Sequence, residues 1–168
     1  RHAGEARLSP ALQALDAALG GTLSRVLAAE KFEGKPGQSS HFYTDGRLAA
    51  LRVLVVGLGP KKEASAEAVR RAAAHGARRA RDLGAVSAAM FLPGEGVPAR
   101  QRAQAVAEGA ILGTYRFDKY LTEKNGKALG AVAVVEPDRR QQALAREGVR
   151  LGEIWAQATC AARDLVNE

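Results

Sequence analysis

Residues 51–57 read Leu51-Arg52-Val53-Leu54-Val55-Val56-Gly57, a β-branched apolar run that ends at a glycine. A short apolar run of this kind is typical of a strand that is buried on both faces of a sheet. Residues 86–92, closed by Pro93-Gly94, are predicted to form the next strand, and residues 131–135 another buried strand. These three runs supply the strands of a predicted sheet.

Segments with helical spacing separate these strands. Ser65 is a predicted N-cap for a helix that ends at Gly84, and residues 98–113 form the next helix. Strands that alternate with helices through right-handed crossovers predict an α/β fold, with a mainly parallel sheet and helices on its faces. The inward positions of the two helices are Val69, Ala72, Ala73, Gly76, Ala80 and Leu83, followed by Val106, Ala110 and Ile111.

Two short helices and a strand are predicted ahead of residue 51. Ser9-Pro10 is a favourable helix start, because Ser can cap free N–H groups and Pro fits the first helical position. Gly20-Gly21 predicts a break in that helix. Residues 31–37 are expected to form a loop, residues 39–44 a strand, and Asp45-Gly46 a turn. The interrupted apolar stripe consists of Leu12, Leu15, Leu19, Leu23 and Val26.

The last segment, residues 139–166, has helical spacing throughout and would be roughly 40 Å long. Its apolar stripe consists of Leu144, Gly148, Leu151, Trp155, Ala158, Ala162 and Leu165. A helix longer than one domain needs, and still apolar in its last turn, is expected to lead into a further domain. We therefore predict an amino-terminal α/β domain at residues 1–138 and a linker helix at residues 139–168.

The composition favours a soluble, cytoplasmic chain with one core. Apolar residues make up 46% of the 168 residues but aromatic residues only 5%, so the core must consist largely of Ala, Val and Leu. No apolar run reaches the roughly 18 residues of a membrane helix, and no signal segment is recognisable. The single cysteine, Cys160, excludes an internal disulfide and fits a reducing compartment.

The net charge of +7 makes a nucleic acid a candidate partner, because Lys and Arg displace counterions from phosphates. The arginines are interspersed with alanine, however, which is typical of solvated helix faces. Solvated faces are the favoured interpretation. The arginines concerned are Arg70, Arg71, Arg78, Arg79 and Arg81.

Gly57-Leu58-Gly59 stands between a strand and a helix, as a dinucleotide-binding loop does. Lys62 replaces the third glycine of that pattern, and Pro60 removes an N–H group that a phosphate would need. A tight structural turn is the favoured interpretation.

No catalytic, cofactor-binding or metal-binding residue is predicted in this chain. His2, His41 and His75 are far apart, and none stands at ligand spacing from a carboxylate or from Cys160. The thiol is predicted to be a packed side chain. Residues 113–120 concentrate scarce aromatic residues and form either a ligand or partner surface or, as we prefer, a helix end anchored into the core.

Five stretches of the sequence resemble the cytosolic leucine aminopeptidases. They occur in the same order as in that family and together span nearly the whole chain, and the last two are the most specific. They are Leu8-Ser9-Pro10 with Leu15-Asp16 and Gly20-Gly21; Phe32 with Gly34-Lys35 and Gly37; Val53-Leu54-Val55-Val56-Gly57-Leu58-Gly59; Glu108-Gly109-Ala110-Ile111-Leu112-Gly113-Thr114-Tyr115-Arg116-Phe117-Asp118-Lys119-Tyr120; and Ala162-Arg163-Asp164-Leu165-Val166-Asn167-Glu168. Residues 1–7 do not resemble the family's first strand.

This resemblance implies a macro-like, three-layer amino-terminal domain, joined by a long helix to a peptidase domain that assembles into hexamers. The implied peptidase removes amino-terminal residues from peptides with two Zn²⁺ or Mn²⁺ ions, which polarise the peptide carbonyl and activate a bridging water. All catalytic and metal-binding residues are expected in that second domain, which is absent here. The fragment alone is expected to be inactive, to bind no metal, and to act in assembly and substrate access.

The expected partners are the chain's own catalytic domain, further copies in a homo-hexamer and peptide substrates, with no membrane. Two alternatives stay open. One is a DNA-contact surface, motivated by the charge and by relatives that bind DNA. The other is ADP-ribose or nucleotide binding, motivated by the macro-like fold and the Gly57-Leu58-Gly59 loop.

Overall fold

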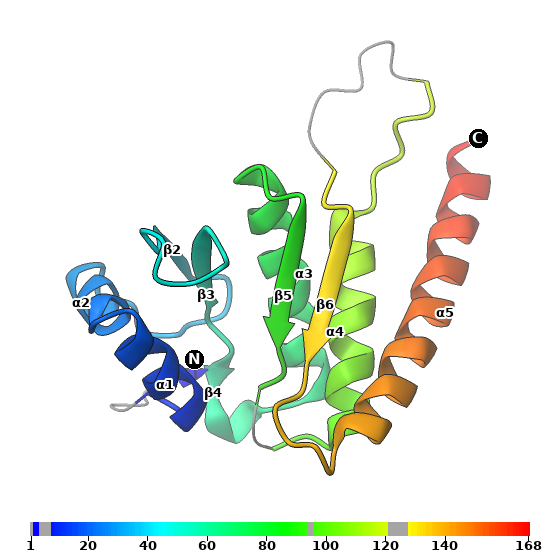
Figure 1. Ribbon diagram of the computed structural model, residues 1–168. Helices are drawn as coiled ribbons and strands as arrows, with labels where there is room; N and C mark the ends of the chain where they lie inside the picture. Colours follow the sequence, from blue (N-terminus) through cyan, green and yellow to red (C-terminus); the bar gives the residue numbers. More distant parts are fainter. Residues whose placement is uncertain (1, 4–7, 94–95, 121–127) are drawn as a thin grey trace. The chain divides into compact units, whose positions relative to one another are not determined.

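The computed structural model describes residues 2–3, 8–93, 96–120 and 128–168 (Figure 1). The chain falls into two units, Arg1–Ala64 and Ser65–Glu168. The described residues form five α-helices and six strands, which confirms the predicted mixed α/β class. The predicted division at residues 138 and 139 concerns a linker to a further domain and stays a prediction.

The first unit pairs its strands in two ways. β2 and β3 are antiparallel, with His41 opposite Leu54, whereas β1 and β4 are parallel, with His2 opposite Gly59. Two of the three strand pairings in the described part of the chain are parallel, as expected for a mainly parallel arrangement. β2 and β3 are antiparallel, because the link between them is too short for a crossover of about a dozen residues. The elements are β1 (His2–Ala3), α1 (Pro10–Ala18), α2 (Thr22–Ala29), β2 (Ser39–Tyr43), β3 (Arg52–Val56), β4 (Gly59–Pro60) and a 3-10 helix (Lys61–Glu63).

Two glycines with left-handed backbone conformation separate α1 from α2. Gly20 has a φ of 61° and Gly21 a φ of 77°, so the predicted helix break is confirmed. Pro10 occupies the first turn of α1 as predicted, but the side chain of Ser9 makes no capping hydrogen bond.

The core of the first unit lies between the helix pair and the β2–β3 ribbon. In β3 only Val55 is fully buried, so the prediction of a strand buried on both faces is wrong. Val53 and Val55, which share one face of β3, belong to the core of this unit or pack against it, whereas Leu54 and Val56 on the other face lie outside that cluster. The core residues are Leu19, Leu23, Leu27, Phe32, Phe42 and Val55.

The second unit contains α3 (Ala66–Asp82), β5 (Ser87–Phe91), α4 (Ala99–Thr114), β6 (Ala131–Val135) and α5 (Gln142–Asn167). β5 and β6 pair in parallel, with Ser87 opposite Ala131, and α4 connects them. The predicted β-α-β alternation is therefore confirmed. The capping role predicted for Ser65 is also confirmed, because its Oγ accepts a hydrogen bond from the Ala68 amide at 3.2 Å.

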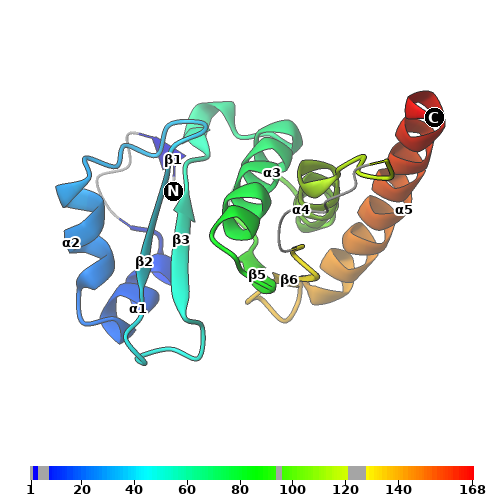
Figure 2. The same cartoon turned by 90° about the horizontal axis from the view of Figure 1, so that it is seen from above.

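Helices cover one face of the β5–β6 pair (Figure 2). Met90 and Val134 pack against the core of this unit, whereas Ala131 and Ala133 on the other face are exposed. The prediction that residues 131–135 form a buried strand is therefore wrong for Ala131 and Ala133. The described part of this unit has one sheet layer and one helix layer, and the third macro-like layer stays a prediction.

Glycines bring α4 into backbone contact with both neighbouring helices. A Cβ at Gly109 would lie 2.3 Å from the Arg70 carbonyl oxygen of α3. On α5, a Cβ at Gly148 would lie 2.1 Å from the Arg100 carbonyl oxygen, and one at Gly152 would lie 2.6 Å from that of Gln104. No side chain fits at such distances, so these helices are packed as closely as two backbones allow.

The face of α5 that contacts α4 differs from the predicted apolar stripe. The buried residues are small ones, namely Ala145, Gly148, Gly152 and Ala156. Of the predicted stripe, only Gly148 is buried. Trp155 is 64% exposed and Leu165 is 76% exposed. Close backbone approach excludes large side chains from the α4 contact, so they occupy a different face.

Among the described residues, no helix combines the length and the apolar character that crossing a bilayer requires.

We predict that Gly148→Ala destabilises the protein by about 2 kcal/mol, as expected for overpacking against rigid backbone. The Cβ would collide with the Arg100 carbonyl oxygen, and this collision outweighs the roughly 1 kcal/mol that alanine gains in helix propensity. Urea unfolding followed by circular dichroism measures the change. Glu153→Ala, at an exposed position of α5, is the control and should stay within about 0.5 kcal/mol of the parent. A Gly148→Ala variant as stable as this control would contradict the packing argument.

Candidate functional site

The two most family-specific stretches of the sequence meet at the end of α5. The Tyr115 hydroxyl donates a hydrogen bond to Asp164 Oδ1 at 2.7 Å. The guanidinium of Arg163 lies 5.5 Å from the centre of the Tyr115 ring, and Lys119 forms an ion pair with Glu168. The Asp164 hydrogen bond also raises the pKa of Tyr115. Residues 115–119 therefore hold the last turns of α5 in place through contacts at the surface. The predicted anchoring of this aromatic segment into the core is wrong for Tyr120, which is 67% exposed.

Glu108, within the same family stretch, is a buried structural carboxylate. It is 6% exposed and accepts hydrogen bonds from Arg70 Nε at 2.6 Å and from Gln104 Nε2 at 2.8 Å. Arg70 also pairs with Glu67. This buried carboxylate links α3 to α4 through the hydrogen bond from Arg70, and it has a structural role.

Arg102 and Glu136 form a buried ion pair that the sequence did not predict. Arg102 Nη2 lies 3.1 Å from Glu136 Oε2, and the two side chains are 7% and 8% exposed. Arg102 Nη1 also donates to the Pro93 carbonyl oxygen at 2.5 Å. Arg102 stands two residues after the exposed Arg100 in α4, and nothing local in the sequence distinguishes the two arginines.

Gly57-Leu58-Gly59 forms a packing turn. The Gly57 amide donates to the Gln38 carbonyl oxygen at 2.8 Å and the Gly59 amide to the Gly34 carbonyl oxygen at 3.0 Å. A Cβ at Gly57 would lie 2.0 Å from the Lys35 carbonyl oxygen. Both glycine amides already donate to backbone carbonyls, so neither is free to bind a phosphate.

The histidines and the cysteine lie on separate elements. His41 is on β2 and His75 on α3, Cys160 is on α5, and His2 belongs to β1. Burial raises the pKa of the Cys160 thiol, which keeps it protonated and unreactive. Within the described part of the chain, no three His, Cys, Asp or Glu side chains are grouped so that they could hold a metal ion. The described residues therefore do not fit the two-metal site of the peptidases.

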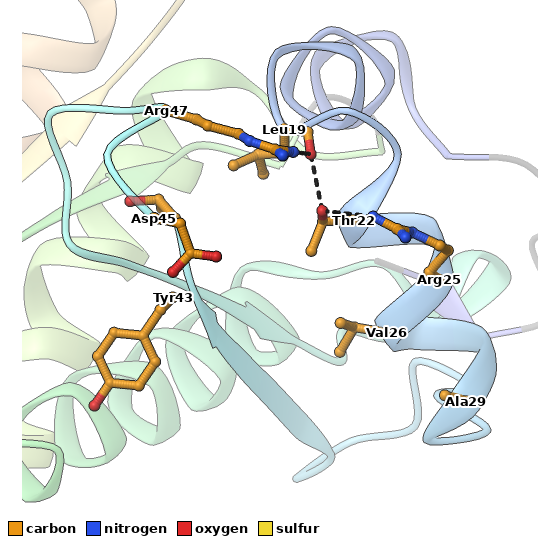
Figure 3. Close-up of a pocket in the computed structure, with 9 residues that line it drawn as sticks. Leu19, Thr22, Arg25, Val26, Ala29, Tyr43, Asp45 and Arg47 are labelled. Carbon is orange, nitrogen blue, oxygen red and sulfur yellow. Dashed lines mark hydrogen bonds between the residues drawn. The ribbon is translucent and has the colours of Figure 1, made fainter.

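Figure 3 shows a surface pocket of about 460 Å³ in the first unit. Arg47 Nη1 donates to the Leu19 carbonyl oxygen at 2.6 Å, and Arg25 Nη2 to Thr22 Oγ1 at 3.1 Å. One nitrogen of each guanidinium is thus engaged within the chain. The described lining contains neither histidine nor cysteine, and it consists of Leu19, Thr22, Arg25, Val26, Ala29, Tyr43, Thr44, Asp45 and Arg47.

Several arginines of α3 are paired with carboxylates. Arg71 lies 3.6 Å from Glu67, and Arg81 lies 3.0 Å from Asp82. With the pairing of Arg70, three of the five interspersed arginines have an acidic neighbour. This local neutralisation supports the interpretation of solvated helix faces over a basic stripe.

Comparison with known proteins gives a consistent picture. Residues 4–124 match the family model described as the N-terminal domain of the cytosol aminopeptidase family. A probable cytosol aminopeptidase of Aquifex aeolicus is 38% identical over 144 residues, which are 86% of this chain and 28% of that protein. One of Syntrophotalea carbinolica is 34% identical over 165 residues, 95% of this chain and 33% of that protein. The chain thus spans about a third of the length of these relatives.

Solved structures agree with the sequence matches. The bottromycin maturation enzyme BotP in complex with Mn has a TM-score of 0.71 and 38% identity, over all of this chain and 30% of that one. A mutant of tomato leucine aminopeptidase has a TM-score of 0.70 and 25% identity, over 90% of this chain and 29% of that one.

We predict that Gly57→Ala destabilises the protein by about 2 kcal/mol, because its Cβ meets backbone atoms that cannot turn away. Gly37→Ala is the control: Gly37 has a φ of 78° but open space around its Cβ position, so the substitution carries backbone strain alone, about 1 kcal/mol. Chemical denaturation of both variants makes the comparison. A smaller loss for Gly57→Ala than for Gly37→Ala would show that the close approach does not matter.

We predict that His75 makes the protein less stable in mild acid. Burial, together with the nearby Arg78 and Arg79, lowers the pKa of His75 below its usual 6.5. The unfolded chain therefore binds a proton before the folded chain does. The stabilisation is present above pH 6.5 and is lost as the pH falls through the folded pKa. His75→Gln should reduce the difference in unfolding free energy between about pH 7.5 and about pH 5.

The companion variant for this test is Arg78→Gln. It removes one of the two positive charges near His75 and should reduce the same pH dependence in part. Equal pH dependence in the parent and in His75→Gln would rule out this histidine as the source.

Proposed function

Because the chain belongs to the cytosol aminopeptidase family, whose N-terminal domain it matches, we propose that it is the non-catalytic amino-terminal domain of a metal-dependent leucyl aminopeptidase. The observation that carries this proposal is the match of residues 4–124 to that domain, together with coverage of only about a third of each curated relative. The catalytic portion, its peptide substrates and its cytoplasmic location all belong to the proposal.

The metal ions of the proposed parent are assigned to residues outside this chain. One structural neighbour was solved in complex with Mn, which supports a divalent metal in the parent, either Mn²⁺ or Zn²⁺. The described residues do not fit such a site, so no chemical step is assigned to them. What they supply is a folded unit with a rigid, closely packed helix layer.

The proposed role of this domain is in assembly and in access of substrate to the catalytic portion. Two features support it. The end of α5 is fixed by Tyr115 and Lys119, and large apolar side chains of α5 remain exposed. A fixed helix with an exposed apolar face suits an element that positions one domain against another. A homo-hexamer of the full-length parent belongs to the same proposal.

Nucleotide binding at Gly57-Leu58-Gly59 is less well supported than the structural role of this turn. Both glycine amides donate to backbone carbonyls, so a pyrophosphate would have to displace existing hydrogen bonds.

We predict that this 168-residue chain hydrolyses no leucyl p-nitroanilide with added Zn²⁺ or Mn²⁺, whereas the full-length parent does so in a chelator-sensitive way. Release of p-nitroaniline measures turnover, and the same preparations with EDTA are the control. Chelator-sensitive hydrolysis by the 168-residue chain itself would place the catalytic residues here and overturn the proposal.

A further inference from the structure

α5 carries a second apolar face that the packing of its own unit does not use. Six side chains define this face, which we name the heptad seam: Leu144, Leu151, Trp155, Ala158, Ala162 and Leu165. They recur at intervals of seven, four, three, four and three residues. We propose that the heptad seam is the docking surface for a helix of the peptidase portion of the parent. The inference rests on the proposed function.

The heptad seam is distinct from the face of α5 that packs on α4. At about 100° per residue, its centre lies about 100° around the helix from that of Ala145, Gly148, Gly152 and Ala156. α4 therefore cannot cover both faces. Within the second unit, α4 is the described element that packs extensively on α5, and Figure 1 shows no other helix beside it.

Exposure of the seam is unusual for residues of this size. Trp155 is the single tryptophan of the chain, and together with Leu144 and Leu165 it is exposed to solvent. Ile154 and Val166, which flank the seam, are exposed as well. Isolated apolar residues on a surface need no explanation, but the apolar series from Leu151 to Leu165 along one face of a helix marks a contact surface.

The spacing of the seam specifies the kind of partner. From Leu151 to Leu165, alternating intervals of four and three residues keep an apolar face turned toward a second helix over about four turns. Trp155 and Leu151 can act as knobs, and Ala158 and Ala162 leave holes for knobs of the partner. A helix is therefore the occupant that this pattern fits best.

The helix that carries the heptad seam is also fixed in position before any partner binds. Tyr115 and Lys119 bind Asp164 and Glu168, and Gly148 and Gly152 lock the first half of α5 onto α4. A rigid surface loses little conformational entropy when a partner binds, so affinity is gained from pre-organisation.

Two observations favour the parent's own peptidase portion over a second copy of this chain. About two thirds of the length of each curated relative lies outside the matched region, so family members have the chain length to supply a partner helix. A second copy would bring a further net charge of +7, and this repulsion opposes association of identical chains.

The experiment compares alkylation rates of introduced cysteines in the full-length parent and in the 168-residue chain. In a Cys160→Ala background, Ala158→Cys places a thiol on the seam and Gln157→Cys places one on a different exposed face. Both thiols are in the same helical turn, so helix fraying affects them equally. Peptide-level mass spectrometry after iodoacetamide reads each site separately.

We expect Ala158→Cys to react at least about tenfold more slowly in the full-length parent than in the 168-residue chain, a ratio equivalent to 1.4 kcal/mol of protection. Gln157→Cys should react at similar rates in both. Equal rates for the two thiols in the full-length parent would overturn the inference. Protection in the 168-residue chain, with a dimer in sedimentation equilibrium, would assign the seam to a second copy and also overturn it.

A charged variant tests the seam without chemical labelling. Leu165→Glu should lower the Tm of the full-length parent by several degrees and leave that of the 168-residue chain unchanged, because only the parent buries this side chain. An unchanged Tm in both would count against the docking role.

Hydrolysis of leucyl p-nitroanilide by the full-length parent is measured separately. An active parent with an unprotected seam refutes this inference alone, and an inactive parent refutes the proposed function.

Discussion

Direct backbone contact between helices, made possible by glycine, is the constraint on which the second unit depends. Gly109 and Gly113 of α4 meet α3, while Gly148 and Gly152 of α5 meet α4. At these distances the helices have no room for side chains, so their separation and their rotation about their own axes are set together. Carbonyl oxygens and small residues make up the contact, and the core needs few aromatic residues.

This constraint decides where the large apolar side chains can go. Because the α4 contact admits only small residues, Trp155 and Leu165 must lie on another face of α5. The polar contacts of Tyr115 and Lys119 then fix the end of that helix. Close packing on one side and an exposed apolar surface on the other are thus two consequences of one helix sequence, and the proposed role in joining domains is based on them.

The first unit also contains a close backbone approach that only glycine allows. Gly57 lets the turn after β3 approach the loop at Lys35, and the Gly57 and Gly59 amides donate hydrogen bonds to backbone carbonyls. A pattern that resembles a phosphate-binding loop therefore has a structural purpose. The sequence already indicated this, because Pro60 and Lys62 depart from the binding pattern at the positions where donors and close approach are needed.

Local rules determined most elements of this protein from sequence alone: β2, β3, β5 and β6 by their composition, the break at Gly20 and Gly21 by backbone freedom, and the cap at Ser65 by its hydroxyl. The same stretches showed the resemblance to the family. The two-residue strands β1 and β4 were not predicted, because each depends on pairing with a distant segment. Only the tertiary structure decided that β3 pairs antiparallel, that Arg102 is buried with Glu136, and which face of α5 packs. These features depend on how closely distant backbones approach, and periodicity along one segment carries no information about that distance.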